Sequence, residues 1–258
     1  MTSLRHTLPH LDQPRLFASS DLHERHDVVL DERVVEASGP TRRDKRDVFN
    51  GRLLSGLTVV GYYGIPQIQS SDLVPDKLIS FSEAMAARQV DPEAWVHFYE
   101  DDYRFVRFWN RPEAYIEKLR RFGGVISPDH SVYRNMVPAQ QIESTFKNQL
   151  LGAWMQACGL DVIANVRLSG HESVPYALAG IPRHSTLSLG LHGCTRAREN
   201  RAHVIEEIGL ICDHCDPSAL LVYGSSAYGV LDEPRSRGIS VHVFAPDTGR
   251  RAEAREAA

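Results

Sequence analysis

Short apolar runs alternate with longer amphipathic or turn-rich stretches along most of this chain. The runs are rich in β-branched residues and are apolar at most positions, a pattern typical of strands in a parallel sheet that is covered on both faces. A half-exposed antiparallel sheet would instead show strict alternation of apolar and polar residues. The runs that we expect to form strands are Leu57–Tyr63, Leu78–Phe81, Trp95–Tyr99, Gly124–Ser127, Leu160–Leu168, Thr186–Leu191, Leu220–Tyr223 and Ile239–Phe244.

Three of the intervening stretches have apolar residues at helical spacing and are expected to form helices: Pro112–Phe122, Pro138–Cys158 and Arg196–Cys215. Strands that alternate with helices imply right-handed crossovers between parallel neighbours. Eight such strands are the number that a (β/α)8 barrel requires. We therefore expect an α/β fold, a distorted and compact (β/α)8 TIM-like barrel, with an open doubly wound parallel sheet as the alternative.

The two ends of the chain differ from its centre. We expect residues 1–52 to form a polar and basic N-terminal extension, 53–248 a single α/β domain of the catalytic type, and 249–258 a flexible tail. The densest basic cluster is Arg42, Arg43, Lys45 and Arg46. It is typical either of an arm that contacts phosphates or of a solvated extension laid over the domain surface.

Composition excludes several classes of protein. Hydrophobic residues make up 42% of the 258 residues, which rules out disorder of the whole chain, and the formal net charge of −4 rules out a polycation that coats nucleic acid. No apolar run is long enough to span a membrane, and no apolar run follows the N-terminal charges as in a signal peptide. Because four cysteines do not make a disulfide framework, we expect a cytoplasmic protein.

Polar residues follow several predicted strands at the point where each strand ends. In a parallel sheet these ends meet at one edge, where ligands usually bind. The residues at these strand ends are Asp129, Ser131, Asn165, Gly190, His192, Gly193, Tyr223, Gly224 and Asp247. Asp129 is the first candidate, because a carboxylate on a rigid strand end can transfer a proton or attack carbon. The unit Asp129-His-Ser131 is also a common turn, in which the carboxylate caps the following segment; both interpretations stay open.

Two motifs suggest metal sites, but each has a simpler explanation. Glu100, Asp101 and Asp102 are adjacent, so their side chains diverge, and a helix cap is favoured over a metal ion. Cys212 and Cys215 lack a second ligand pair and lie in the last turn of a predicted helix, where burial is favoured over zinc. We therefore expect neither a metal nor a cofactor. The aromatic stretch from Trp95 to Trp109 favours core packing over stacking on bases.

Motifs from Trp95 to about Gly224 resemble a bacterial and phage family, domain of unknown function 4417. The matching segments include 98–102, the run from Phe122 to Ser131, 162–166, 180–182, and 222–224. The resemblance implies the company of phages or mobile elements, and hence the host cytoplasm, but the family name declares no activity.

A second and weaker resemblance is to the guanine transglycosylases, which include phage enzymes that place 7-deazaguanine bases in DNA. These enzymes are (β/α)8 barrels with an aspartate-serine element, a glycine-containing strand over the base and a late aspartate as nucleophile. Asp129 with Ser131, Gly190 to Gly193, and Asp247 follow in that order. The zinc motif of the tRNA enzymes is absent, which argues against a tRNA substrate.

This resemblance implies a pentosyl-transferring glycosyltransferase whose partners are DNA and a 7-deazaguanine precursor base. Asp129 would recognise or protonate the base, and Asp247 would attack the sugar. Gln156 and Asn165 would bind the polar edge of the base, and the basic cluster would hold phosphates. Two alternatives stay open: a non-catalytic nucleic-acid-binding phage accessory protein, and a small-molecule nucleoside or sugar hydrolase.

Overall fold

The structure is a computed structural model, and it describes residues 34–36, 47–194 and 197–246. Most of the predicted N-terminal extension and all of the predicted tail lie outside these residues. The basic cluster and Asp247 lie outside them as well: Arg42, Arg43, Lys45, Arg46 and Asp247.

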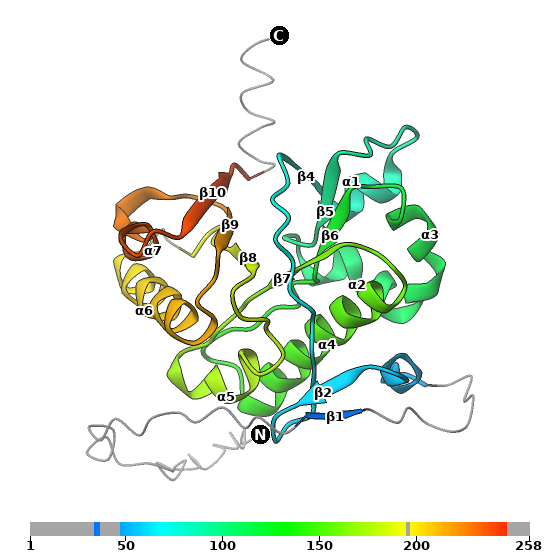
Figure 1. Cartoon of the computed structure of the whole chain (residues 1–258), viewed down its shortest axis with the longest axis horizontal. Helices are drawn as coiled ribbons and strands as arrows, with labels where there is room; N and C mark the ends of the chain where they lie inside the picture. The colour runs from blue at the N-terminus through cyan, green and yellow to red at the C-terminus, as the bar shows by residue number, and fades with distance from the viewer. Residues whose placement is uncertain (1–33, 37–46, 195–196, 247–258) are drawn as a thin grey trace, which may run out of the picture.

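Seven parallel strands form the central sheet, and they pair in the order of the sequence (Figure 1). The strands are β4 (Lys77–Ser80), β5 (Ala94–His97), β6 (Gly124–Ile126), β7 (Val162–Asn165), β8 (Thr186–Gly190), β9 (Ala219–Tyr223) and β10 (Ser240–Phe244). Each falls within or beside a predicted strand. The α/β class with a parallel sheet is therefore confirmed.

The first predicted strand, Leu57–Tyr63, does not join this sheet, so the count of eight parallel strands was wrong. Its central part is β2 (Thr58–Val60), which lies between β1 (Val34–Glu36) and β3 (Ile65–Pro66) in a small antiparallel sheet. Only four residues separate β2 from β3, whereas a parallel neighbour needs a crossover of a dozen or more. Gly61 and Gly64, with φ of +73° and +62°, turn the chain back instead.

The seven-stranded sheet is open, because β4 and β10 pair with no further described strand on their outer edges. It curls like half of a barrel, with the helices around its convex side (Figure 1). A closed barrel is thus not formed by the described strands, whereas the open parallel pairing is consistent with the alternative expectation, an open doubly wound parallel sheet. The sequential strand order is nevertheless the order found in barrels.

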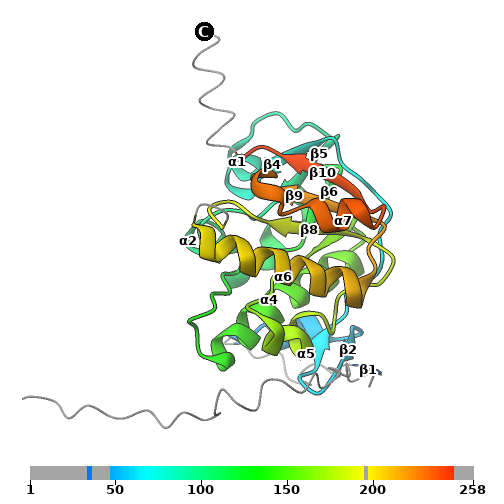
Figure 2. The same ribbon diagram turned by 90° about the vertical axis from the view of Figure 1, so that its left-hand side faces the viewer.

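The helices follow the strands as the predicted alternation requires. They are α1 (Phe81–Ala86), α2 (Asp102–Asn110), α3 (Ile116–Leu119), α4 (Pro138–Ala157), α5 (Val174–Ala177), α6 (Arg198–Cys215) and α7 (Asp232–Ser236). Short 3₁₀ turns occur at Gly51–Leu54, Pro112–Ala114, His171–Ser173 and Ala227–Gly229. The two long predicted helices are found as α4 and α6, which lie along the outside of the sheet (Figure 2). The shorter prediction, Pro112–Phe122, divides into a 3₁₀ turn and α3. No helix in the described ranges is long and apolar enough to cross a membrane.

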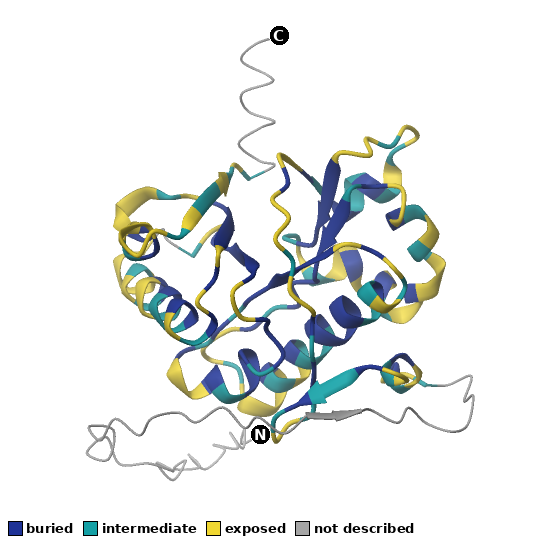
Figure 3. Ribbon diagram, in the orientation of Figure 1, coloured by how far each residue is buried: buried dark blue, intermediate teal, exposed yellow. Residues whose placement is uncertain are grey.

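Side chains alternate between the two faces of each strand and form two unequal apolar cores. The strands of the sheet are mostly buried, and exposed residues lie mainly on the outer sides of the helices and in loops (Figure 3). The larger core lies between the sheet and the helices. The smaller one contains Leu78, Trp95, Ile126, Ile163, Leu221 and Tyr223, contributed by strands β4 to β7 and β9. Asn165 and Arg167 lie two and four residues after Ile163, so their side chains are on the same face of the sheet as the smaller core, closer to the carboxyl edge.

Candidate functional site

A cleft of about 820 Å³ opens at the carboxyl edge of the sheet. The end of every strand contributes to its wall, in the order Ser80, Tyr99, Asp129, Arg167, Gly190, Tyr223 and Pro246. The cleft therefore lies where the strand-end pattern of the sequence placed the candidate residues.

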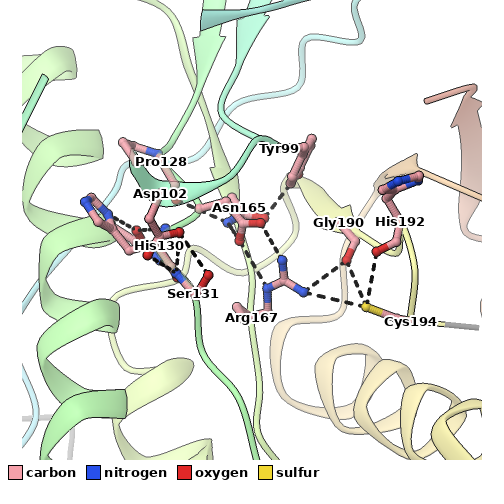
Figure 4. A network of polar contacts seen from close by, with 12 residues as sticks. Tyr99, Asp102, Pro128, His130, Ser131, Asn165, Arg167, Gly190, His192 and Cys194 are labelled. Carbon is pink, nitrogen blue, oxygen red and sulfur yellow. Dashed lines mark hydrogen bonds and ion pairs between the residues drawn. The ribbon is translucent and has the colours of Figure 1, made fainter. Parts of the chain in front are cut away.

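An ion pair between the buried Asp129 and the half-buried Arg167 lies in the wall of this cleft. Arg167 Nε donates to Asp129 Oδ1 at 3.1 Å, and Arg167 Nη2 donates to Asp129 Oδ2. Asn165 Nδ2 donates to the same Oδ1 at 2.8 Å, and it also donates to the carbonyl of Pro128 at 3.2 Å. Asp129 is only 7% exposed, so these contacts fix one orientation of its carboxylate. Figure 4 shows the side chains of Asn165 and Arg167 next to each other in this network of polar contacts.

Tyr99 and Ser188 extend the network to the neighbouring strands. The Tyr99 hydroxyl donates to Asn165 Oδ1 at 3.1 Å and lies 2.6 Å from the Ser188 hydroxyl. Burial raises the pKa of Tyr99 well above its usual range, and the charge of Asp129 adds to this shift. The phenol therefore stays protonated and orients the amide of Asn165, so that its nitrogen faces Asp129.

Arg167 keeps its positive charge. Burial lowers the pKa of Arg167, but attraction and hydrogen bonds to Asp129 outweigh it and raise the pKa above its usual range. Arg167 Nη1 also donates to the carbonyl of Gly190 at 3.2 Å and lies 3.9 Å from Cys194 Sγ. Arg167 thereby ties β6, β7 and β8 together at the carboxyl edge.

Two side chains from helices hold the loop that carries Asp129. Asn148 on α4 accepts from the backbone N–H of His130 at 2.7 Å and donates to its carbonyl at 3.3 Å. Asp102 at the start of α2 accepts from the hydroxyl of Ser131 at 2.9 Å and from its backbone N–H at 3.2 Å. Ser131 in turn accepts from Tyr133 at 3.0 Å. Asp129 and Ser131 therefore have separate roles, one in the ion pair and one in the anchor to α2.

Gly190 allows a close approach, but the approaching groups belong to this chain. A Cβ at this position would lie 2.7 Å from Tyr99 Cδ1 and 3.3 Å from Arg167 Nη2. Because glycine has no side chain, the ring of Tyr99 and the guanidinium of Arg167 can pack directly against the backbone at the end of β8.

The remaining residues of the strand ends divide between the cleft and its surroundings. His192 and Tyr223 line the cleft, His192 being exposed and Tyr223 buried with its ring stacked on Tyr99 at 5.0 Å. Gly193 is exposed in the loop after β8, and Gly224 packs against that loop, where a Cβ would lie 2.8 Å from the backbone of His192. Neither glycine lines the cleft, so their positions indicate loop geometry rather than ligand contact.

Gln156 lies away from the cleft. It occupies the last turn of α4, where its amide accepts from the backbone of Gln69 at 2.8 Å and donates back to the carbonyl of the same residue at 3.1 Å. Helix α4 runs from the carboxyl edge back to the amino edge of the sheet, which places its end there. The structure therefore brings Asn165, but not Gln156, to Asp129.

The two motifs that suggested metal sites fill other roles. Glu100 accepts from the backbone N–H of Ser82 at 2.8 Å, and Asp101 precedes α2 as its N-cap without a capping side-chain bond. Cys212 and Cys215 are buried in the last turn of α6, and burial raises their pKa values to about 11 and 12. Within the described ranges, no three His, Cys, Asp or Glu residues gather at metal-binding distance.

Arg167, Tyr99 and Ser188 are the network members that were absent from the predicted site. Arg167 and Ser188 could have been predicted from the sequence, because residues two apart on a strand share a face. Arg167 is two positions from Asn165, and Ser188 is two positions from Gly190. Tyr99 was assigned to the core with the aromatic stretch, and its hydroxyl contact could not be read from the sequence.

A second carboxylate, that of Glu207, lies on the other side of Arg167 in a separate small pocket. Glu207 on α6 lines a small pocket next to Arg167, Gly190 and Cys194, and its Oε1 lies 3.8 Å from Arg134 Nη1. Burial raises the pKa of Glu207 to about 7, although the two arginines oppose this shift. The group therefore titrates near neutral pH.

Comparisons with known proteins agree with the motif analysis. A family model described as Domain of unknown function (DUF4417) matches residues 57–235, which confirms the first resemblance. The "Gene 1 protein" of Mycobacterium phage L5 is 28% identical over 188 residues, covering 71% of this chain and 80% of the relative. The "Gene 1 protein" of Mycobacterium phage D29 is 25% identical over 189 residues, covering 73% and 69%. No solved structure matches significantly.

Proposed function

We propose, from the premise that this chain belongs to the DUF4417 family and from the geometry of its cleft, that it exchanges guanine in DNA for a 7-deazaguanine base. The observation that carries the proposal is the Asp129 carboxylate, held in the cleft wall by Arg167 and Asn165. Among the described residues, Oδ2 accepts only from Arg167 Nη2, which leaves one of its two acceptor sites for a ligand.

This acceptor suits the donor edge of a guanine-type base. Such a base presents a ring N–H beside an exocyclic amino group, and a fixed carboxylate can accept from these donors. The rings of Tyr99 and Tyr223 stack at 18° and both line the cleft. Tyr223 is buried and Tyr99 is half-buried, so the accessible part of the Tyr99 ring offers an aromatic contact for a planar ligand. Because Asp129 already accepts three hydrogen bonds from Asn165 and Arg167, we assign it to recognition of the base rather than to attack.

The proposed exchange consists of two displacements at C1′ of a nucleotide taken out of the base stack. First, the carboxylate of Asp247 bonds to C1′ while the C1′–N9 bond breaks, and guanine leaves with a proton from a general acid. Second, N9 of the incoming deazapurine loses its proton to a base and attacks C1′, and Asp247 leaves as a carboxylate. Asp247 lies outside the described residues, and its chain neighbour Pro246 lines the cleft.

The sequential winding of the sheet supports the same proposal. Guanine transglycosylases, to which the chain bears the weaker resemblance, are (β/α)8 barrels, and seven parallel strands in sequence order follow that winding. We propose that the sheet is an incomplete barrel of this type. The cleft at its carboxyl edge is then the equivalent of a barrel active site.

The direct test is a base-exchange assay. Purified protein is incubated with duplex or single-stranded DNA, labelled guanine and 7-cyano-7-deazaguanine, and the digested nucleosides are separated by mass spectrometry. We expect labelled guanine in the DNA, or a deazaguanine nucleoside in its place. No incorporation, under conditions in which an authentic transglycosylase works, would reject the proposal.

Variants separate the assigned roles. Asp247→Asn should abolish exchange, and Asp129→Asn should raise the KM for the base at least tenfold. Asp161→Asn is the matched control, because Asp161 is exposed at the amino end of β7 and should leave exchange unchanged. Equal losses in all three variants would contradict the assignment.

One observation favours a second candidate, a hydrolase of a small nucleoside or sugar. The charged side chains that line the cleft include five acids (Glu83, Glu100, Asp101, Asp102, Asp129) and two arginines (Arg104, Arg167). This excess of negative charge suits an uncharged ligand better than a polyanion. Release of free base from nucleosides, without any exchange into DNA, would favour this candidate.

A further inference from the structure

The face of α2 that points to solvent differs in charge from the cleft beside it. Tyr103 and Arg104 in its first turn line the cleft, and Arg107 and Arg111 continue toward its C-terminal end. All four residues are exposed, Tyr103 to 69%. We call Tyr103, Arg104, Arg107 and Arg111 the α2 surface.

The three arginines are spaced so that they follow one side of the helix. Arg104 and Arg107 are one turn apart, and Arg111 follows one turn later at the C-cap. At the rise of an α-helix they extend over roughly 10 Å. A row of guanidinium groups of this length can contact the phosphates of neighbouring nucleotides.

Carboxylates compensate this charge only at the cleft end. Arg104 lies 3.9 Å from Glu100 Oε2 and 3.9 Å from Asp101 Oδ2. Within the described part of the chain, neither Arg107 nor Arg111 has a carboxylate at ion-pair distance. Arg107 instead lies over the ring of Phe81, 5.2 Å from its centroid, which holds the guanidinium in place without neutralising it.

We propose that the α2 surface binds a single strand of DNA and leads it into the cleft, with Tyr103 stacking on a base and Arg107 and Arg111 contacting phosphates. Charge complementarity selects this partner, because aromatic rings beside a basic track are the features that bind unpaired strands. The inference rests on the proposed function for the choice of DNA as the polymer. It also assigns the acidic cleft to the base and the basic surface to the backbone, so that the two charges no longer conflict.

The test is fluorescence anisotropy of the full chain with a labelled single-stranded oligonucleotide, repeated over a range of salt concentrations. Each lost phosphate contact lowers the slope of log K against log salt by about 0.7 for single strands. Arg107→Gln/Arg111→Gln should therefore weaken binding about tenfold at low salt and lower the slope by about 1.4. Arg107→Lys/Arg111→Lys should keep most of the slope, because the charge remains.

The matched control is Arg121→Gln/Arg183→Gln, which removes the same charge from exposed positions that precede β6 and β8 at the amino edge. It should change the Kd less than twofold. An equal loss in control and test variants would overturn the proposal, as would an unchanged slope in the test variant or tighter binding of a duplex with the same sequence. If the double variant fails to fold, Arg111→Gln alone should lower the slope by about 0.7.

Tyr103→Ala should weaken binding severalfold and leave the slope unchanged, because stacking is not a charge contact. These outcomes are independent of base exchange. Binding that depends on Arg107 and Arg111 without any exchange would reject the proposed enzyme and keep the α2 surface. Exchange that is unaffected by the same variants would keep the enzyme and reject this surface.

Discussion

The guanidinium of Arg167 covers both carboxylate oxygens of Asp129, with Nε donating to Oδ1 at 3.1 Å and Nη2 donating to Oδ2. The two residues come from the ends of neighbouring strands, 38 positions apart in the sequence. The side chain of Asp129 is 7% exposed and that of Arg167 is 25% exposed, so water has little access to the carboxylate and partial access to the guanidinium. Removal of either charge leaves the other without compensation, which is the costly case for a buried ion pair.

Replacement of Arg167 alone should therefore destabilise the protein. We expect Arg167→Met to lower the free energy of unfolding by about 3 kcal/mol, measured by urea unfolding followed by circular dichroism. The double variant Asp129→Asn/Arg167→Met should lose less than the sum of the two single variants, because no unpaired charge remains. Additive losses would show that the pair contributes nothing as a unit.

Gly190→Ala should disturb the network without touching its polar atoms. The new Cβ would lie 2.7 Å from Tyr99 Cδ1 and 3.3 Å from Arg167 Nη2, so the ring and the guanidinium must both shift. We expect a loss of stability of about 1–3 kcal/mol and a loss of base exchange. Gly209→Ala is the control, because it lies within α6 and its nearest neighbour, at 3.1 Å, is the flexible end of Glu233. That variant should be neutral or more stable, since alanine favours the helix. Equal effects of both substitutions would contradict the packing argument.

The fold was predictable to the level of its repeating unit. Apolar runs predicted all seven parallel strands, and apolar residues at helical spacing predicted the bounds of α4 within a residue. The closure of the sheet was not predictable, because a run such as Leu57–Tyr63 is apolar in a hairpin and in a barrel strand alike. Its short connection to Ile65 was the local signal against a parallel partner.

The candidate site was predictable where it depended on strand ends and not where it depended on long-range partners. Asp129, His192 and Tyr223 line one cleft, and the buried Asn165 donates to Asp129 in its wall, because parallel strands end at one edge. Gln156 was assigned from a resemblance, and helix α4 carries it to the other edge. The partner of Asp129 was not assigned, because the chain between Asp129 and Arg167 includes a whole helix whose packing sets their distance.

The C-x-x-C motif gives a prediction about thiol reactivity. Burial raises the pKa values of Cys212 and Cys215 to about 11 and 12, so few thiolates form at these positions at pH 8. We expect both to react with iodoacetamide more slowly than the half-buried Cys158 and Cys194, as measured by peptide mass spectrometry of the folded protein. All four should react rapidly in denaturant. Early labelling of Cys212 or Cys215 in the folded protein would contradict their buried placement.

Glu207 makes the stability of the protein depend on pH near neutrality. Burial raises its pKa from an ordinary value of 4.5 to about 7, so between these values the folded state binds more protons than the unfolded state. The contribution of this proton to the free energy of unfolding is fully present below pH 4.5. It is lost as the pH rises through 7, where the folded protein releases the proton. Glu207→Gln should remove this dependence and stabilise the protein at pH 8 by on the order of 1 kcal/mol, because the neutral amide, like the protonated carboxyl group, carries no charge into the buried site.

At about pH 5, below the folded-state pKa, the same substitution should have little effect, since the carboxyl group is then protonated in the folded state. Urea unfolding at several pH values between these limits measures the difference. Glu199→Gln is the control, because Glu199 is exposed on the same helix and should give a difference that does not vary with pH. If the difference between Glu207→Gln and the unmodified chain stays constant over this range, Glu207 titrates like an exposed carboxyl group, and its burial beside Arg134 and Arg167 does not control the proton.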